Sequence, residues 1–336
     1  MSAPNPPSEK TSLAQQYGGR HSGTWVDRLP RSWIPYVQLA RLSPPAGLFL
    51  IFFPHLFGAL HASLSVPQPL HSLAQTLPLL LLGSLFFSNA AHTYNDLIDA
   101  PLDALVSRTK TRPIPRGAVT PTAAFLFATS QALLAALCLV FLPKDTSLAA
   151  LATVVATFYY PYAKRHTHFV QFILGFCLAW GVVVGAAAVG AAKPWEDRGT
   201  LCLVGAVGCW VVVFDTIYAH QDLTDDVRVG VKSMAVLVNK GGGRWARGFL
   251  VTMGLLMGLL MVGCGWSGGM GVVYYAVAVG GSVVSVGMMV LKVELEDHGS
   301  CWVWFSKGFW VTGTAIAVGF LGEHRARIGE LSLGIL

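Results

Sequence analysis

Long apolar stretches alternate with short polar segments along most of the chain. A membrane-spanning helix needs about 20 mainly apolar residues, and nine stretches come close to or exceed this length. They cover residues 36–63, 73–95, 121–142, 146–163, 169–191, 200–220, 246–266, 271–291 and 302–322. The pattern therefore predicts an all-α integral membrane protein with about nine transmembrane helices.

The segments between these stretches are too short to form a separate soluble domain. We expect one transmembrane domain over residues 34–324, a disordered polar N-terminal tail at 1–33 and a short C-terminal tail at 325–336. Pro44, Pro45 and Pro54 interrupt the first stretch. Membrane helices tolerate such breaks where neighbouring helices satisfy the freed carbonyl groups.

Composition supports a membrane protein and argues against other classes. Of the 336 residues, 54% are hydrophobic and 12% are charged, whereas a soluble domain carries about 25% charged residues. The net charge of +6 comes from basic residues in short loops between apolar segments. Such loops suit anionic lipid or a polyanionic ligand rather than nucleic acid.

Basic residues also predict the orientation in the membrane, because they concentrate in cytosolic loops. With nine spans and a cytosolic N-terminus, 18 of the 23 lysines and arginines lie on the cytosolic side and 5 on the other. We therefore expect the N-terminus in the cytosol, with the protein in the endoplasmic reticulum or another endomembrane. The first thirty or so residues lack both the apolar core of a secretory signal and the acid-free, arginine-rich helix of a mitochondrial one.

Acidic residues gather in two short runs at the expected cytosolic ends of the second and sixth stretches. Asp96 and Asp99 are three residues apart, and Asp222 and Asp226 are four apart, so each pair shares one helical face. Pro101 is expected to end the first of these helices, with Asp103 returning from the loop that follows. Each run therefore places carboxylates at one spot on the same membrane surface.

The chemistry of these runs favours a metal and a polyphosphate. Carboxylates so close together repel one another and are poorly solvated beside a bilayer, and a divalent cation relieves both problems. All-oxygen ligands without histidine or cysteine indicate Mg²⁺ rather than zinc. Basic residues that could bind phosphate follow both runs: Arg108, Lys110, Arg112, Arg116, Arg228 and Lys232. The alternative is that these charges are merely solvated or paired with one another.

The motifs resemble those of the UbiA superfamily of intramembrane prenyltransferases. Residues 95–103 match its NDxxDxxxD motif, and residues 108–117 match the RTxxRP continuation with its later glycine. Residues 160–167 are similar to YPxxKRxT, and residues 215–233 to DTxYAxQDxxDDxxxGxKS. The resemblance runs from about residue 36 to the last span. It implies a ring of nine transmembrane helices around a central cavity, in agreement with the independent count.

One departure from the family pattern suggests a subfamily. The family's first span often reads RxDKPxG, whereas residues 41–47 here have Ser43 and Pro44 in place of Asp and Lys. The run from Arg41 to Pro54 and the stretch 300–305 are similar to fungal members that prenylate polyketide-derived aromatics in meroterpenoid pathways. This resemblance implies a farnesyl donor and a phenolic acceptor.

The family resemblance also implies roles for individual residues. Five carboxylates would hold Mg²⁺ against the isoprenyl diphosphate: Asp96, Asp99, Asp103, Asp222 and Asp226. Asn95 and Asp225 would assist them, and Arg112, Arg116 and Lys232 would neutralise the phosphate oxygens. Withdrawing charge from the leaving group lets the allylic C–O bond ionise in a dry cavity.

Further candidates each have an ordinary alternative. Asp215, inside an apolar stretch, could accept a proton or orient the acceptor, or it could form a hydrogen bond between helices. Tyr162 and Tyr218 could face the carbocation or lie in the interfacial belt. Three basic residues could bind an acceptor carboxylate or phosphate, or could serve only as topology markers: Arg41, Lys164 and Arg165.

The sequence leaves several functions open. The favoured one is Mg²⁺-dependent transfer of a prenyl group from its diphosphate to a small aromatic acceptor. Rivals on the same scaffold are polyprenyl transfer to 4-hydroxybenzoate, farnesyl transfer to haem, and a membrane terpene cyclase that needs no acceptor. A cation transporter is the rival outside enzymes, but it would distribute its charges through the spans.

Overall fold

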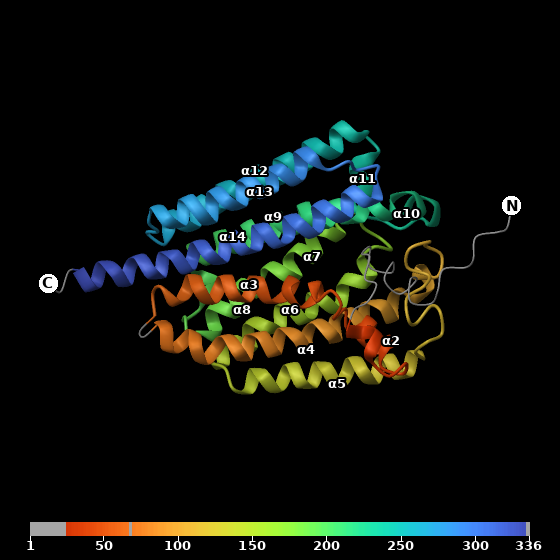
Figure 1. The fold of residues 1–336 in the computed structure, drawn as a ribbon, viewed down its shortest axis with the longest axis horizontal. Helices are drawn as coiled ribbons and strands as arrows, with labels where there is room; N and C mark the ends of the chain where they lie inside the picture. The colour runs from red at the N-terminus through yellow and green to blue at the C-terminus, as the bar shows by residue number, and fades with distance from the viewer. Residues whose placement is uncertain (1–24, 67–68, 334–336) are drawn as a thin grey trace.

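A computed structural model describes residues 25–66 and 69–333, and every regular element in this part of the chain is helical (Figure 1). The long helices are α3 (Ala46–Ser63), α4 (Pro69–Asp103), α5 (Pro121–Val140), α6 (Lys144–Ala163), α9 (Arg198–Ala219), α12 (Gly243–Ser267), α13 (Gly281–Lys292) and α14 (His298–Leu333). The shorter helices are η1 (Trp25–Arg28), α2 (Ile34–Leu39), α7 (Val170–Ala179), α8 (Gly181–Ala188), η2 (Pro194–Glu196), η3 (His220–Asp222), α10 (Leu223–Val229), α11 (Met234–Asn239) and the π-helical η4 (Tyr274–Gly280).

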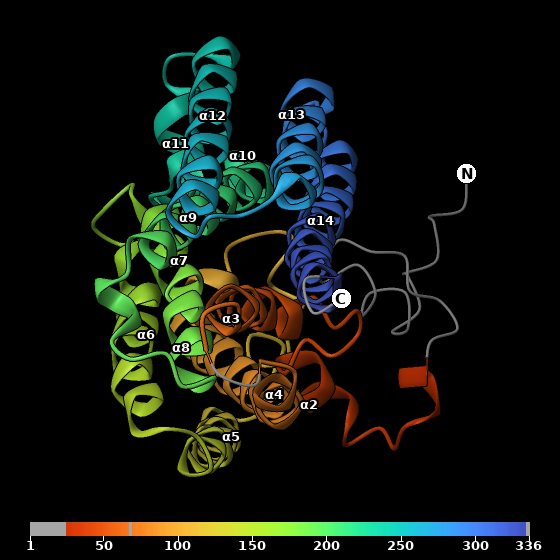
Figure 2. The ribbon, with the colours of Figure 1, turned by 90° about the vertical axis from the view of Figure 1, so that its left-hand side faces the viewer.

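The long helices lie side by side and form a closed bundle (Figures 1 and 2). Neighbours in the chain are neighbours in space from α3 to α14, and α14 then returns to pack against α3 and α9. The short helices α2, α10 and α11 lie at one end of the bundle (Figure 1). This end carries the acidic runs, because α4 and α9 both point their C-termini toward it.

Seven helices of the described chain are long and apolar enough to cross a membrane: Ala46–Ser63, His71–Asp103, Pro121–Val140, Val170–Ala188, Arg198–Val229, Gly243–Ser267 and Tyr274–Lys292. The protein is thus a multi-pass, all-α membrane protein. The other two expected spans, 146–163 and 302–322, coincide with α6 and α14, which are not among the seven. The count of nine therefore stays a prediction.

One helix boundary was predicted wrongly. Pro101 was expected to end the helix and leave Asp103 in a loop, but α4 continues through Pro101 to Asp103. A proline in the last turn removes only one N–H bond, and the Ala104 amide still donates to the Ala100 carbonyl at 3.1 Å. Asp96, Asp99 and Asp103 consequently share one helical face.

The predicted domain limits at 34 and 324 stay predictions, although helix continues beyond the second of them to Leu333. Most of the expected N-terminal tail lies outside the described residues. Within the described part of that tail, Trp25–Arg28 form the short helix η1.

Aromatic rings fill the centre of the bundle between α3, α9 and α14. Trp210 stacks on Phe309 with ring centroids 5.4 Å apart, and Phe57 and Phe214 pack against the same indole. On the other side of α3, glycines allow α8 to approach closely. A Cβ added at Gly58 would overlap the Val182 carbonyl, and one added at Gly185 would overlap the His55 carbonyl. The two backbones therefore touch without side chains between them.

Replacing Gly185 by alanine is expected to lower the thermal unfolding temperature in detergent. The added methyl group meets a backbone carbonyl that cannot rotate away, and such overpacking costs about 1–3 kcal/mol. Gly248→Ala on α12 is the matched control, because a Cβ there has no neighbour within 4 Å and alanine is the better helix former by up to about 1 kcal/mol. Equal shifts in the two variants would contradict the close approach of α3 and α8.

Candidate active site

A cavity of about 280 Å³ opens between the ends of α4, α6 and α9. Eleven of the residues singled out from the sequence line it: Arg41, Asn95, Asp99, Asp103, Arg112, Lys164, Asp215, Tyr218, Asp222, Asp226 and Lys232. Five do not, namely Asp96, Arg116, Tyr162, Arg165 and Asp225. The two acidic runs, more than a hundred residues apart in sequence, thus share one vestibule.

The first acidic run is buried and paired with arginine. Asp96 is fully buried, and its Oδ1 accepts hydrogen bonds from Arg41 and Arg112, each at 3.0 Å. The same Nη1 of Arg112 donates to Asp103 Oδ2 at 2.8 Å. One guanidinium therefore bridges two carboxylates of a single helical face, and burial of all three side chains strengthens their attraction.

Asp99, the middle carboxylate of the run, contacts the end of α6. Its Oδ2 accepts a hydrogen bond from Lys164 Nζ at 2.5 Å, and its Oδ1 lies 3.5 Å from Arg165 Nη1. Lys164 directly follows the last residue of α6. Lys164 and Arg165, which follow the fourth apolar segment, thus contact the acidic face of α4.

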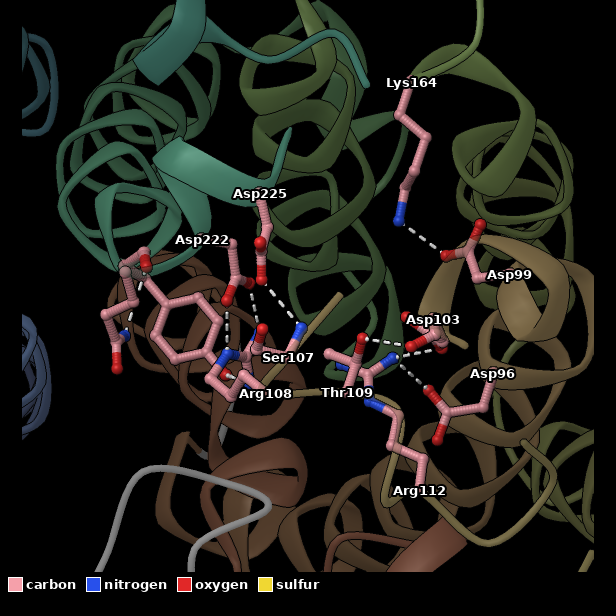
Figure 3. A network of polar contacts seen from close by, with 12 residues as sticks. Asp96, Asp99, Asp103, Ser107, Arg108, Thr109, Arg112, Lys164, Asp222 and Asp225 are labelled. Carbon is pink, nitrogen blue, oxygen red and sulfur yellow. Dashed lines mark hydrogen bonds and ion pairs between the residues drawn. The ribbon is translucent and has the colours of Figure 1, made fainter. Parts of the chain in front are cut away.

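The second acidic run is bound by the loop that follows α4 (Figure 3). Arg108 donates from Nε and Nη2 to both oxygens of Asp222, at 2.8 and 2.5 Å, and from Nη1 to the Tyr218 hydroxyl at 2.9 Å. The Ser107 amide donates to Asp225 Oδ2 at 2.7 Å. Burial opposes the charged form of Arg108, but the oxygens of Tyr218 and Asp222 outweigh it and raise the pKa of the guanidinium.

The loop therefore lies between the two runs and contacts both. Figure 3 shows Ser107 and Arg108 reaching toward Asp222 and Asp225, with Arg112 reaching toward Asp96 and Asp103. The Thr109 hydroxyl fixes the turn between these groups by donating to the Asp103 carbonyl at 3.0 Å. This pairing of carboxylates with nearby cations was the alternative left open from the sequence.

Gly230 ends the second acidic segment in a conformation that favours glycine. Its φ is 81°, in the left-handed region, and its amide caps α10 through the Asp226 carbonyl. The chain then turns, so that the Lys232 amide donates to the Lys164 carbonyl at 2.9 Å. This turn brings Lys232 to the rim of the cavity.

Below the charged rim the cavity becomes apolar and aromatic. Tyr218, Trp302, Phe214 and Phe305 form one wall, with the rings of Tyr218 and Phe305 centred 4.8 Å apart. Asp215 lies deeper on α9, and Gln171 of α7 lines the same cavity. Gln171 Oε1 accepts the Met234 amide at 2.8 Å. The choice considered for Asp215, between a hydrogen bond and a role toward the acceptor, stays a prediction.

Three of the expected binding residues, Arg116, Tyr162 and Arg165, do not line the cavity. Arg116 donates to the Thr111 carbonyl and to Gln38 Oε1, at 2.7 and 2.8 Å. Tyr162 is 43% exposed on the outer surface, and the Arg165 guanidinium lies 5.8 Å from the centre of its ring. These positions place them around the rim rather than in the cavity.

The family model for the UbiA prenyltransferase family matches residues 51–313, which contain both acidic runs and the loop between them. The chain belongs to this family. It is a prenyltransferase, and this supports group transfer over the cation transporter left open above.

Two relatives show the likeness to named prenyltransferases. The mitochondrial 4-hydroxybenzoate polyprenyltransferase of Saccharomyces cerevisiae is 33% identical over 91% of this chain and 80% of its own length. The prenyltransferase ascA of Acremonium egyptiacum is 35% identical over 75% of this chain and 78% of its own.

The fold also matches a solved structure of the family. A UbiA homolog from Archaeoglobus fulgidus, bound to GPP and Mg²⁺, superposes with a TM-score of 0.63 at 17% identity. The superposition covers 85% of this chain and 98% of the archaeal one. At this identity the likeness shows the fold alone. The archaeal protein binds Mg²⁺, which raises the question of whether the residues of this chain fit a divalent metal.

The oxygen atoms of the first run fit Mg²⁺. Asn95 Oδ1, Asp96 Oδ2 and Asp99 Oδ1 are buried and lack hydrogen-bond partners, and a hard cation prefers such oxygens. No group of three acidic, histidine or cysteine side chains in the described residues forms a ready-made metal centre. A bound Mg²⁺ would therefore take its other ligands from water and phosphate, as it commonly does.

The structure adds residues to the site and sharpens the role of one. Arg108 was named only among the basic residues that could bind phosphate, yet it makes the bidentate contact with Asp222. Trp302 and Phe305 were noted only as a subfamily similarity. The RT signature itself could have identified Arg108, whereas Gln171 carries no motif that would set it apart.

Arg112→Ala is expected to destabilise the prenyltransferase by about 3–5 kcal/mol, because it leaves Asp96 and Asp103 buried without this cation. Arg116→Ala is the control, since its guanidinium bonds neutral oxygens and its loss should cost about 1–2 kcal/mol. Unfolding of both variants in detergent measures the difference. Indistinguishable losses would mean that the bridge between the two carboxylates does not stabilise the fold.

Proposed function

We propose that the enzyme transfers an isoprenyl group, farnesyl, from its diphosphate to a polyketide-derived phenolic acceptor in meroterpenoid biosynthesis. The observation that carries this proposal is the single cavity that both acidic runs line. Its rim has carboxylates and cations for a metal diphosphate, and its interior has aromatic and apolar walls for the prenyl group and the ring. The family membership and the ascA relative support it.

The rim binds the leaving group. Mg²⁺ would be held by Asp96, Asp99, Asp103, Asp222 and Asp226 with assistance from Asn95 and Asp225, and when bound it would draw charge from the diphosphate. Arg108, Arg112, Lys164 and Lys232 exchange carboxylate or carbonyl partners for phosphate oxygens, which suits guanidinium and ammonium groups. The cations that now neutralise the carboxylates thus become the phosphate ligands.

The interior protects the reactive group. The allylic C–O bond breaks and its electron pair leaves with the diphosphate, so the carbon becomes cationic. Tyr218, Trp302 and Phe305 face this charge with their rings and exclude water. A carbon of the phenolic ring then bonds to the allylic carbon. The ring proton leaves to a base, and Asp215 is positioned on the same cavity to accept it or to orient the acceptor.

The placement in the cell is part of the same proposal. The basic residues of the loop after α4 and of α10 lie at the end of the bundle that binds diphosphate, and the charge rule puts such an end in the cytosol. We propose a cytosolic N-terminus and an endomembrane location, where soluble prenyl diphosphates reach the rim.

A second candidate function is polyprenyl transfer to 4-hydroxybenzoate. The high coverage of the match to the yeast enzyme favours it. Arg41, Lys164 and Arg165 supply cations near the cavity that could bind the benzoate carboxylate in this case.

Microsomes that contain the protein are expected to transfer a prenyl group only with Mg²⁺ present. Asp96→Ala and Asp222→Ala should each reduce turnover by at least about 100-fold, as loss of a group that stabilises transition-state charge does. Asp197→Asn is the control, because Asp197 lies just before the N-terminus of α9, whereas the second acidic run follows its C-terminus. The 22 residues of α9 separate the two by about 33 Å. Full activity of either site variant, at equal membrane insertion, or activity in excess chelator would contradict the proposed site.

The choice between the two acceptors rests on a substrate panel. Geranyl, farnesyl and geranylgeranyl diphosphates are each offered with 4-hydroxybenzoate and with polyketide-type phenolic acids. Preference for farnesyl diphosphate with a phenolic acid supports the first function. Preference for 4-hydroxybenzoate with the longest donor supports the second, and diphosphate release without any prenylated ring would indicate a cyclase.

A further inference from the structure

His92 of α4 lines the active-site cavity, although its hydrogen bonds stay within its own helix. It lies three residues before the NDxxDxxxD motif, and Asp96 follows one helical turn closer to the rim (Figure 3). Four residues of helix correspond to about 6 Å along its axis. The imidazole therefore lies just below the carboxylates and cations that are proposed to bind the metal diphosphate.

One ring nitrogen of His92 is bound to the preceding turn of α4. Nδ1 lies 2.8 Å from the Ser88 carbonyl oxygen and 3.1 Å from the Ser88 hydroxyl oxygen. A carbonyl oxygen only accepts hydrogen bonds, and a neutral imidazole carries a hydrogen on one nitrogen and a lone pair on the other. This contact assigns the hydrogen to Nδ1, so Nε2 is a hydrogen-bond acceptor.

Helix α3 holds the ring in this orientation. A Cβ added at Gly47 would come within 2.7 Å of His92 Cε1, 3.1 Å of its Nδ1 and 3.1 Å of Ser88 Oγ. The backbone of α3 therefore covers the Nδ1 side of the imidazole. Among the described residues Nε2 has no hydrogen-bond partner, yet it is not one of the buried polar atoms that lack one. It is thus the nitrogen that a ligand in the cavity can reach.

Two other histidines make the same contact elsewhere in the bundle. Nδ1 of His55 lies 2.6 Å from the Ile51 carbonyl oxygen. Nδ1 of His220 lies 2.7 Å from the Thr216 carbonyl oxygen, and its Nε2 is buried. Neither residue lines the active-site cavity. The bond to the preceding turn fixes the ring in all three cases, and His92 differs in that its second nitrogen is accessible from this cavity.

The lone pair of Nε2 distinguishes among the groups that the cavity would hold. Ionised diphosphate oxygens are themselves acceptors and have no hydrogen to donate, and a prenyl chain has no polar hydrogen. Mg²⁺ prefers oxygen ligands, and the described residues contain no group of three acidic, histidine or cysteine side chains placed to hold a metal. An aromatic acceptor with a free hydroxyl group supplies the donor that Nε2 lacks.

We propose that His92 Nε2 accepts a hydrogen bond from the hydroxyl group of the aromatic acceptor and so orients the ring below the diphosphate. This inference rests on the proposed prenyl transfer and adds a substrate-binding residue to it. A hydroxyl group makes the ring carbons ortho and para to it nucleophilic, so holding the hydroxyl selects the carbon that faces the allylic cation. The hydroxyl keeps its proton, and the ring proton leaves to the base proposed above.

Binding of acceptor probes tests this contact without requiring turnover. The purified full-length protein, with Mg²⁺ and farnesyl thiolodiphosphate as a slowly ionising donor analogue, is dialysed against 4-hydroxybenzoate or 2,4-dihydroxybenzoate. The wild-type protein is expected to bind at least one of these acids about tenfold more tightly than the methyl ether of the same acid. The ether lacks the donor and leaves Nε2 without a partner.

Two substitutions of His92 separate the roles of its two nitrogens. His92→Asn places an amide near the position of Nδ1 and nothing at Nε2, so its Kd for the hydroxylated acid is expected to rise about tenfold. His92→Gln reaches the Nε2 position with an amide oxygen and is expected to recover most of this loss. His55→Asn is the matched control, because His55 makes the same contact with its own helix outside this cavity, and it should bind the acid as the wild-type protein does.

Several results would overturn the assignment of His92. They are equal affinity of the wild-type and His92→Asn proteins, an equal loss in the Asn and Gln variants, and a wild-type protein that binds neither acid or does not distinguish the acid from its ether. An equal loss would mean that the imidazole only supports the helix. Transfer by the wild-type protein together with an unchanged acceptor KM in His92→Asn removes this inference alone. Absence of transfer from every donor removes the proposed function, and the binding measurements remain valid in that case.

Discussion

The structure depends on the need to neutralise carboxylates inside an apolar bundle. Asp96 and Asp99 are buried near the membrane end of α4, where an unpaired charge is very costly. Each is paired, Asp96 with Arg41 and Arg112 and Asp99 with Lys164. These cations come from three different segments. Their ion pairs with the carboxylates therefore hold the end of α6, the segment before α3 and the loop after α4 close together.

The same constraint connects stability with function. In water a guanidinium–carboxylate pair contributes little, but in a buried site the attraction is stronger and loss of one partner is severe. A metal diphosphate offers both signs of charge at once. In the proposed reaction a bound metal would take the place of a cation beside the carboxylates, and the guanidinium groups would bind the phosphates. The carboxylates and guanidinium groups could therefore change partners without leaving a buried charge uncompensated.

Much of this arrangement was readable from the sequence because it depends on local rules. Apolar length predicted the seven candidate spans of the described chain, and spacings of three and four put Asp96 beside Asp99 and Asp222 beside Asp226. The path of the loop was not readable, since it follows from tertiary pairing. Helix α4 also continues through Pro101, because one lost N–H bond is a small penalty beside the contacts of Asp103 with Arg112. Arg116 and Tyr162 lie within or beside the family motifs at unspecified positions, and their side chains lie outside the cavity.

The space between α4, α5 and α6 illustrates a different limit of sequence reasoning. The alanines of α5 look like ordinary helix-packing residues, and a stripe of small side chains usually brings two helices together. Here the facing helix does not follow, because α6 leans on α7 and α8 instead. The same stripe then borders a space rather than a contact. Whether small residues produce close packing or an open space depends on the position of the third helix, and only the assembled bundle contains that information.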